Sequence, residues 1–397
     1  MTTYTTLIIL SGLVIFSYLF DLVASKTKLP AVLLLLLLGI GLRVLVDNLK
    51  IHTFDFLKIL PTLGTVGLIL IVFEGSLELK YEREKNKLIK GAFFSALFIL
   101  IASVSVITFI IYKITGQSFY TCFTNAIPFS VVSSAIAIPS AAALVKKSRE
   151  FIIYESSFSD ILGIILFNFA ISNPHISASS FAGLGLNTLL IVILSAVSCI
   201  VLLYIMGKIS HHIKFFLIIS ILILVYAIGQ SYHLSSLVLV LAFGLFLNNA
   251  DAIQHAWFRS IFIYKNLSND LTQLYQLSAE SAFIIRTFFF VIFGFTMNIY
   301  TLNDQVVIAN GLIILAAIFI IRFLYLKLFR KENSGQEAFI APRGLISILL
   351  YFNLPASLKI PEVGTSFLFL VVLGSSLVMS IGLLATKKSK TKPEGLV

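Results

Sequence analysis

The stretch that decides the fold is FYTCFTNAIPFSVVSSAIAIPSAAALV (119–145), which is followed after five residues by FIIYESSFSDILGIILFNFAI (151–171). Both segments reach the length of about 20 residues that a helix needs to cross a bilayer. The first is interrupted by prolines, and the second contains two acidic residues. An ionisable group at membrane depth is costly and marks an ion or proton pathway. Non-helical backbone is tolerated at that depth only where it is buried in protein or lines a cavity. We therefore predict an ion site near the membrane midplane.

The composition is that of an integral membrane protein. Of the 397 residues, 58% are hydrophobic and 12% are charged, and the mean hydropathy is +1.02. Soluble domains carry about 25% charged residues. The net charge of +11 does not indicate nucleic-acid binding, because the basic residues lie in short connections between apolar runs. Cys122 and Cys199 lie in apolar runs without ligand spacing, so neither a disulfide framework nor a zinc site is expected.

Apolar runs predict an all-α polytopic membrane protein with about thirteen transmembrane helices. They lie near 4–23, 29–46, 57–78, 88–113, 119–145, 152–171, 179–206, 213–229, 233–249, 280–300, 305–330, 338–355 and 362–385. Lys and Arg collect in the odd-numbered connections and in the basic tail at 386–397. The positive-inside rule therefore predicts an external N-terminus and a cytoplasmic C-terminus. Because no organellar targeting peptide is recognised, a bacterial inner membrane is expected.

Thirteen spans divide into two sets of six that are separated by one linker span. Because the linker crosses the membrane once, the second set has the opposite orientation in the membrane to the first. In this division the fifth and twelfth spans correspond, and both contain proline: Pro128 and Pro139 in one, Pro342 and Pro355 in the other. Paired interrupted segments at matching positions indicate the binding site of a transporter. We therefore predict two inverted six-helix repeats. This prediction rests on the topology alone, because no sequence similarity between the two halves is visible.

Asp160 is the candidate ion-binding carboxylate. It lies about ten residues beyond the inner end of the sixth span, roughly 15 Å deep in a hydrocarbon core about 30 Å thick. Ser156 and Ser157 share its helix face at positions i−4 and i−3, so their hydroxyl oxygens can surround the same cation. No Lys lies mid-span to neutralise Asp160, which favours an ion site over a structural ion pair.

The broken fifth span supplies further oxygen atoms. Pro139 cannot donate to the carbonyl of Ala135, and Pro128 cannot donate to that of Thr124. The hydroxyl groups at 133–134 lie between the two prolines. We expect these oxygens to face the same point as Asp160.

Glu155 points about 140° away from Asp160 around the helix, so it is expected to pair with an arginine. Arg322 in the eleventh span lies at a compatible depth, and Arg286 in the tenth span competes for this role. Glu74 is a candidate for a cytoplasmic funnel.

Arg343 lies between Pro342 and Gly344 in the twelfth span. Its charge is expected to balance carbonyl groups exposed where helices cross, and the alternative is an anchor at the inner leaflet. No nucleotide-binding loop, metalloprotease motif or nucleophile–base pair is present, so neither a cofactor nor an enzyme is expected.

An ordered series of motifs runs through nearly the whole chain. In order they are VFEGSLEL (72–79), SSAIAIPS (133–140), ESSFSD (155–160), YAIGQSYHLSSLVLVLAFGLFLNN (226–249), FIIRTFFFVIFG (283–294), Arg322 and PRGLIS (342–347). The series resembles the monovalent cation–proton antiporter superfamily, most closely its electroneutral sodium/proton exchanger branch.

The resemblance implies that Asp160 binds either a cation or a proton, that Glu155 and Arg322 form a structural ion pair, and that spans 5 and 12 are crossed, discontinuous helices. It also implies a homodimer in the lipid bilayer. Its expected parts are scaffold helices at 1–78 and 213–300, core helices at 88–171 and 305–385, a linker helix at 179–206, and the cytoplasmic tail at 386–397.

The chain departs from the family pattern at two places. Ser159 stands where the family signature has Asn, and Ser133-Ser134 stand where the fifth span has Thr-Asp. The site therefore holds one ion-binding carboxylate. One carboxylate that alternates between one cation and one proton predicts 1:1 electroneutral exchange, with Ser133, Ser134, Ser156, Ser157 and Ser159 as further oxygen ligands.

The predicted function is exchange of Na⁺, or of K⁺ or Li⁺, for H⁺. One alternative is a proton-coupled transporter of a different solute, which competition between that solute and H⁺ without cation effects would favour. Another is a membrane sensor or scaffold without transport, which predicts no flux at any pH.

Overall fold

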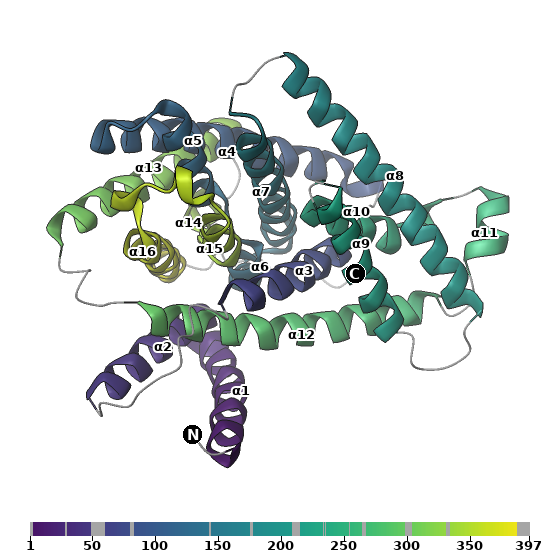
Figure 1. Ribbon diagram of the computed structural model, residues 1–397, viewed down its shortest axis with the longest axis horizontal. Helices are drawn as coiled ribbons and strands as arrows, with labels where there is room; N and C mark the ends of the chain where they lie inside the picture. Colours follow the sequence, from purple (N-terminus) through teal and green to yellow (C-terminus); the bar gives the residue numbers. More distant parts are fainter. Residues whose placement is uncertain are drawn as a thin grey trace, which may run out of the picture.

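The computed structural model describes residues 3–27, 30–48, 60–79, 83–142, 144–174, 178–208, 215–232, 234, 236–253, 255–263, 267–297, 304–330 and 334–386. Within these ranges the regular structure is entirely helical (Figure 1). The predicted tail at 386–397 lies outside the described residues apart from Thr386.

Within the described residues, each of the thirteen predicted runs overlaps a helix or, for the fifth and twelfth runs, a pair of helices. The helices are α1 (Thr3–Thr27), α2 (Ala31–Asn48), α3 (Leu60–Glu78), α4 (Asn86–Thr115), α5 (Phe119–Ser130), α6 (Ser134–Ala141), α7 (Lys146–Ser172), α8 (Ala178–Lys208), α9 (Phe215–Ser231), α10 (Ser236–Asn248), α11 (Ala256–Phe262), α12 (Leu267–Thr296), α13 (Gln305–Phe329), α14 (Ser334–Phe339), α15 (Leu345–Phe352) and α16 (Thr365–Ala385). Seven helical segments of the described chain are long and apolar enough to cross a membrane, and shorter apolar helices accompany them. The predicted class, an all-α polytopic membrane protein, is confirmed.

The tenth predicted span begins earlier than expected. Helix α12 starts at Leu267, whereas the apolar run was predicted to start at 280. Leu267, Leu274, Ser278 and Ala282 are buried at helical spacing, so the added part is amphipathic. Its polar residues lower the local hydropathy and hide the helix from a search for continuous apolar runs.

The helices pack as two groups. In the first, α12 lies between α1 and α2 on one side and α3 on the other, and α10 packs against α3, α8 and α9 (Figure 1). In the second, α4 packs against α5, α7 and α13, and α16 packs against α13 and α14. The groups meet where α15 contacts α3 and where α10 contacts α7. The assignment of α1–α3 and α9–α12 as scaffold, of α8 as linker and of the second group as moving core stays a prediction, as does the inversion of the repeats.

Two glycines bring α2 and α12 into backbone contact. A Cβ atom added at Gly39 would overlap the carbonyl oxygen of Val291, and one added at Gly294 would overlap that of Leu36. Small residues at such crossings let two membrane helices approach closely and gain van der Waals contact. This contact fixes α12 within the first helix group.

The two broken spans cross at their interruptions. Helix α5 ends at Ser130, and α6 starts at Ser134 after three residues of which Val131 and Ser133 are extended. The backbone between α14 and α15 is likewise not helical. The amide N–H of Ser133 donates to the carbonyl oxygen of Pro342 at 2.9 Å, which joins one interruption to the other. The predicted crossing of discontinuous helices is therefore present.

The four prolines of these spans occupy different places. Pro128 lies in the last turn of α5, and Pro139 lies inside α6. Pro342 lies in the non-helical link before α15, whereas Pro355 follows the end of that helix. The interruption of the twelfth span is therefore associated with Pro342.

Candidate functional site

The carboxylate of Asp160 lies on α7 against the first residue of α6. Its Oδ2 atom accepts a hydrogen bond from the backbone N–H of Ser134 at 3.1 Å. The first N–H groups of a helix have no partner within the helix and carry partial positive charge, so they stabilise an anion. Asp160 is 7% exposed, and its Oδ1 atom has no hydrogen-bond partner among the described residues. One carboxylate oxygen is thus held by the backbone of α6, and the other is buried without a hydrogen-bond partner among the described residues.

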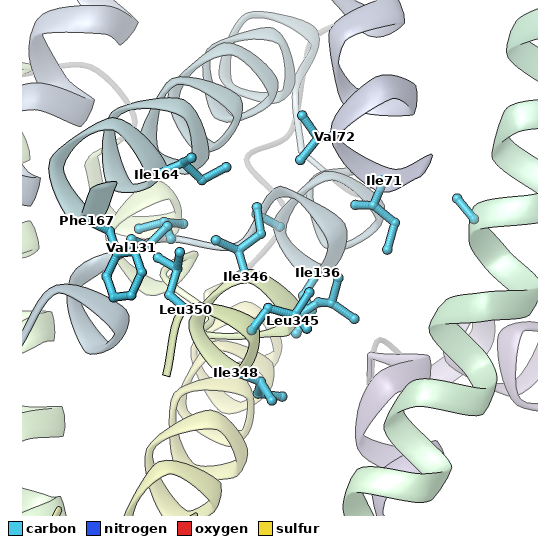
Figure 2. Close-up of a cluster of buried hydrophobic side chains, with 14 of the residues drawn as sticks. Ile71, Val72, Val131, Ile136, Ile164, Phe167, Leu345, Ile346, Ile348 and Leu350 are labelled. Carbon is cyan, nitrogen blue, oxygen red and sulfur yellow. The ribbon is translucent and has the colours of Figure 1, made fainter. Parts of the chain in front are cut away.

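A small cavity of about 20 Å³ adjoins this carboxylate. Ser134, Ser157 and Asp160 supply its polar lining, and the remaining lining residues are glycine and aliphatic side chains from α3, α7, α10 and α15. A space of this size holds about one water-sized group. Figure 2 shows the apolar surroundings, with Ile71 and Val72 of α3 lying opposite side chains of α7 and α15. The cavity therefore lies between the two helix groups.

Two of the predicted serine ligands direct their hydroxyl protons at their own helix. The Ser157 hydroxyl donates to the carbonyl of Ile153 at 2.8 Å, and the Ser156 hydroxyl donates to that of Ile152 at 2.7 Å. A hydroxyl oxygen that donates its proton still has lone pairs that can accept a cation. Ser157 lines the cavity, whereas Ser156 is fully buried and does not.

Two further predicted hydroxyl ligands, Ser133 and Ser159, lie at the helix crossing. The Ser159 hydroxyl oxygen accepts a hydrogen bond from the backbone N–H of Val132 at 2.9 Å, so it satisfies the interrupted backbone of the fifth span. The Ser133 hydroxyl is buried without a hydrogen-bond partner among the described residues. Neither residue lines the cavity. Of the proposed ligands, the structure brings Ser134, Ser157 and Asp160 together.

Gly344 permits the close approach of the two broken spans. A Cβ atom added there would lie 2.7 Å from Ser133 Oγ and 2.8 Å from Ile136 Cδ1. We expect Gly344→Ala to destabilise the protein by about 1–3 kcal/mol, as overpacking does in closely packed interiors. A lower apparent unfolding temperature in detergent would report this loss. Gly335→Ala is the matched control, because nothing lies within 4 Å of an added Cβ there, and equal unfolding temperatures for both variants would contradict the prediction.

Arg343 neutralises the carbonyl end of α5. Its Nε atom donates to the Phe129 carbonyl at 2.8 Å, and its Nη2 atom donates to that of Ser130 at 3.2 Å. The last carbonyl groups of a helix lack intrahelical donors and carry partial negative charge. Nη1 also donates to the carbonyl of Ala341 at 2.7 Å. Because Arg343 is 1% exposed, the alternative of an inner-leaflet anchor is wrong.

Glu155 and Arg322 form a buried ion pair with two parallel hydrogen bonds, each 2.7 Å long. The Ser95 hydroxyl of α4 donates to Glu155 Oε1 at 3.3 Å. Arg322 Nε donates to the backbone carbonyl of Glu337 at 3.0 Å. The pair therefore connects α4, α7, α13 and α14 on the side of α7 away from the cavity.

Arg286, the other candidate partner of Glu155, makes different contacts. Its Nη2 atom lies 3.1 Å from Glu74 Oε2, and its Nη1 atom donates to the carbonyl oxygen of Ala135 at 3.2 Å. The Ala135 carbonyl, which was expected to face the bound ion, thus accepts a hydrogen bond from Arg286, and its part in ion binding stays a prediction. The depth of a residue along its helix does not reveal which neighbouring helix its side chain faces. Arg286 meets Glu74 because α12 packs against α3.

Glu337 is a buried acidic residue that lies between the predicted spans 305–330 and 338–355. Its Oε2 atom lies 2.8 Å from Arg330 Nε, and the Arg330 guanidinium lies 3.4 Å from the centroid of the Phe151 ring. The signal for this contact is weak in the sequence, because RKENSGQE (330–337) reads as an ordinary charged connection. Folding places Arg330 against Phe151 near the start of α7, and Glu337 beside Arg330.

The family model for the transmembrane region of sodium/hydrogen exchangers matches residues 11–387, which include the crossed spans, Asp160 and the Glu155–Arg322 pair. This chain belongs to the sodium/hydrogen exchanger family. The exchanger is therefore a membrane protein of a transporter family, and its activity class is antiport of a monovalent cation against protons. Neither alternative, a transporter of another solute or a sensor without transport, is favoured.

Solved structures give the same fold. The exchanger is similar to the structure of the sodium proton antiporter MjNhaP1 from Methanocaldococcus jannaschii that was solved at pH 8, with a TM-score of 0.68. The two sequences are 20% identical, and the match covers 97% of this chain and 99% of that chain. An electron-microscopy structure of the same antiporter matches with a TM-score of 0.66 and 19% identity, over 97% of this chain and 95% of that chain. A comparison with curated proteins found no significant match.

Proposed function

We propose that the protein exchanges Na⁺ for H⁺ in 1:1 stoichiometry at the carboxylate of Asp160. The observation that carries this proposal is the state of that side chain: it is buried, one oxygen accepts the Ser134 amide, and the other has no hydrogen-bond partner among the described residues. A buried carboxylate is unfavourable as a bare anion. Either a proton or a cation relieves this cost, so the two ions compete for one group.

The proposed cation ligands are oxygen atoms. A hard cation prefers carboxylate, hydroxyl and carbonyl oxygens, and the cavity offers Asp160, Ser134 and Ser157. Ser133, Ser156 and Ser159 do not line the cavity. We propose that they support the site, with Ser159 stabilising the broken backbone through its contact with Val132.

Alternating access is proposed to come from movement between the two helix groups. The cavity is lined by α3 and α10 of one group and by α6, α7 and α15 of the other, so a relative displacement would change the access to Asp160. In this proposal α1–α3 and α9–α12 form the scaffold of a homodimer, and α4–α7 with α13–α16 form the mobile core. The proposed setting is a bacterial inner membrane, with the N-terminus outside and the C-terminus in the cytoplasm.

The test is proton movement in sealed proteoliposomes that contain a pH-sensitive dye. Na⁺, K⁺ and Li⁺ are added in turn, with and without valinomycin and a protonophore to control the membrane voltage. Electroneutral antiport predicts a pH change driven by Na⁺ that is insensitive to imposed voltage. A response to K⁺ or Li⁺ instead would correct the cation, a voltage-dependent rate would correct the stoichiometry, and no response from folded protein would overturn the proposal.

A further inference from the structure

The guanidinium of Arg286 joins the two helix groups beside the cation site. Nη1 donates to the Ala135 carbonyl of α6 at 3.2 Å, and Nη2 lies 3.1 Å from Glu74 Oε2 of α3. The Arg286 and Glu74 side chains are each 15% exposed. Helices α3 and α12 pack against each other, whereas α6 packs against α7. A residue of the first group therefore holds the backbone of the second.

The Ala135 carbonyl needs this contact because of Pro139. In an α-helix each carbonyl accepts from the N–H four residues later, and a proline at that position has none. The neighbouring bond is intact, since the Ala137 N–H donates to the Ser133 carbonyl at 2.9 Å. A carbonyl without a donor away from water is costly. Arg286 thus supplies the donor that Pro139 removes.

This contact lies one residue from the group that binds Asp160. Ser134 precedes Ala135, and its N–H is the donor to Asp160 Oδ2. Helix α6 has eight residues, and a helix of this length is not stable without outside contacts. Holding the first turn of α6 at Ala135 therefore fixes the direction of the Ser134 N–H.

We propose that Arg286 is a positioning residue for the cation site, which acts by binding the carbonyl that Pro139 leaves free and thereby orienting the Ser134 amide toward Asp160. This inference rests on the proposed exchange at Asp160. Glu74 orients the guanidinium, because its carboxylate pairs with Nη2 while Nη1 reaches the Ala135 carbonyl. Because the donor and the acceptor belong to different helix groups, the contact forms when those groups are positioned as in this structure.

The first test compares cation affinity in two arginine variants. Arg286→Gln is expected to raise the KM for Na⁺ about tenfold, with a smaller effect on the maximal rate, as expected for a lost hydrogen bond to a charged group. The Na⁺ concentration that gives half of the cation-induced rise in unfolding temperature should increase by a similar factor. Arg43→Gln is the control and should leave both values unchanged, because Arg43 pairs with Asp47 of its own helix at an exposed position.

The second test uses Pro139→Ala, which returns an N–H to position 139 and so supplies a donor to the Ala135 carbonyl. In that background Arg286→Gln should change the KM little. If Arg286→Gln raises the KM equally in both backgrounds, Arg286 does not act through Ala135 and the inference is overturned. If Arg286→Gln gives unstable protein, Arg286→Lys replaces it in both backgrounds, because an ammonium group keeps the charge but lacks the planar two-edged geometry.

The outcomes separate the inference from the proposed function. If the wild-type protein shows neither cation-driven flux nor cation-induced stabilisation, exchange at Asp160 fails and the inference fails with it. If the wild-type protein responds to Na⁺ and Arg286→Gln loses stability without a change in KM, exchange stands and Arg286 has a purely structural role. A raised KM that Pro139→Ala suppresses supports the assignment of Arg286 as a positioning residue.

Discussion

Replacing Asp160 with asparagine is expected to reduce cation-driven proton movement to the level of empty liposomes while leaving a folded protein. Asparagine has nearly the same shape, and its carbonyl oxygen can still accept the Ser134 N–H that now binds Asp160 Oδ2. The amide has no charge to neutralise a cation and no site that takes up a proton near neutral pH. Flux in proteoliposomes measures the loss, and the unfolding temperature without cations reports the fold.

The control for this variant is Asp47→Asn, which removes an acidic group that is exposed and paired with Arg43 within α2. Its flux should equal that of the wild-type protein. The Asp160→Asn protein should also lose the rise in unfolding temperature that Na⁺ produces, because it no longer binds the ion. Exchange that persists in Asp160→Asn would exclude this carboxylate as the exchanging group.

Replacing Arg322 with methionine is expected to produce the largest loss of stability. Glu155 is 1% exposed, and both of its carboxylate oxygens bond to the Arg322 guanidinium. Removing one partner of a buried pair leaves an uncompensated charge and costs about 3–5 kcal/mol. The backbone carbonyl of Glu337 also loses its donor. We expect little folded protein and a strongly lowered unfolding temperature in detergent.

A second substitution separates the charge from the packing. Adding Glu155→Gln to Arg322→Met removes the unpaired charge, so part of the stability should return, with the Ser95 hydroxyl still able to bond to the new side chain. Arg259→Met serves as the control because Arg259 is exposed on α11. If Arg322→Met has the unfolding temperature of the Arg259→Met control, the pair does not contribute to stability.

Features that depend on the local chain could be predicted from the sequence. Continuous hydropathy identifies the helices because a membrane span must be apolar over its whole length. Pro128, Pro139 and Pro342 indicate the broken spans because proline lacks the donor that a helix requires. Asp160 stands out because a carboxylate at that depth is costly and needs a function.

Apart from the Glu155–Arg322 pair, which the family resemblance implied, only the tertiary structure decided which side chains meet. The sequence offered Arg322 and Arg286 as partners of Glu155 at similar depth, and the choice depended on which faces of α7, α12 and α13 turn toward one another. The sequence could not reveal that the Ser159 hydroxyl accepts a hydrogen bond from the interrupted backbone at Val132, or that Arg286 donates to the Ala135 carbonyl. Hydropathy and proline content act along a single segment, whereas these contacts join residues distant in the chain whose positions follow from the packing of all the helices.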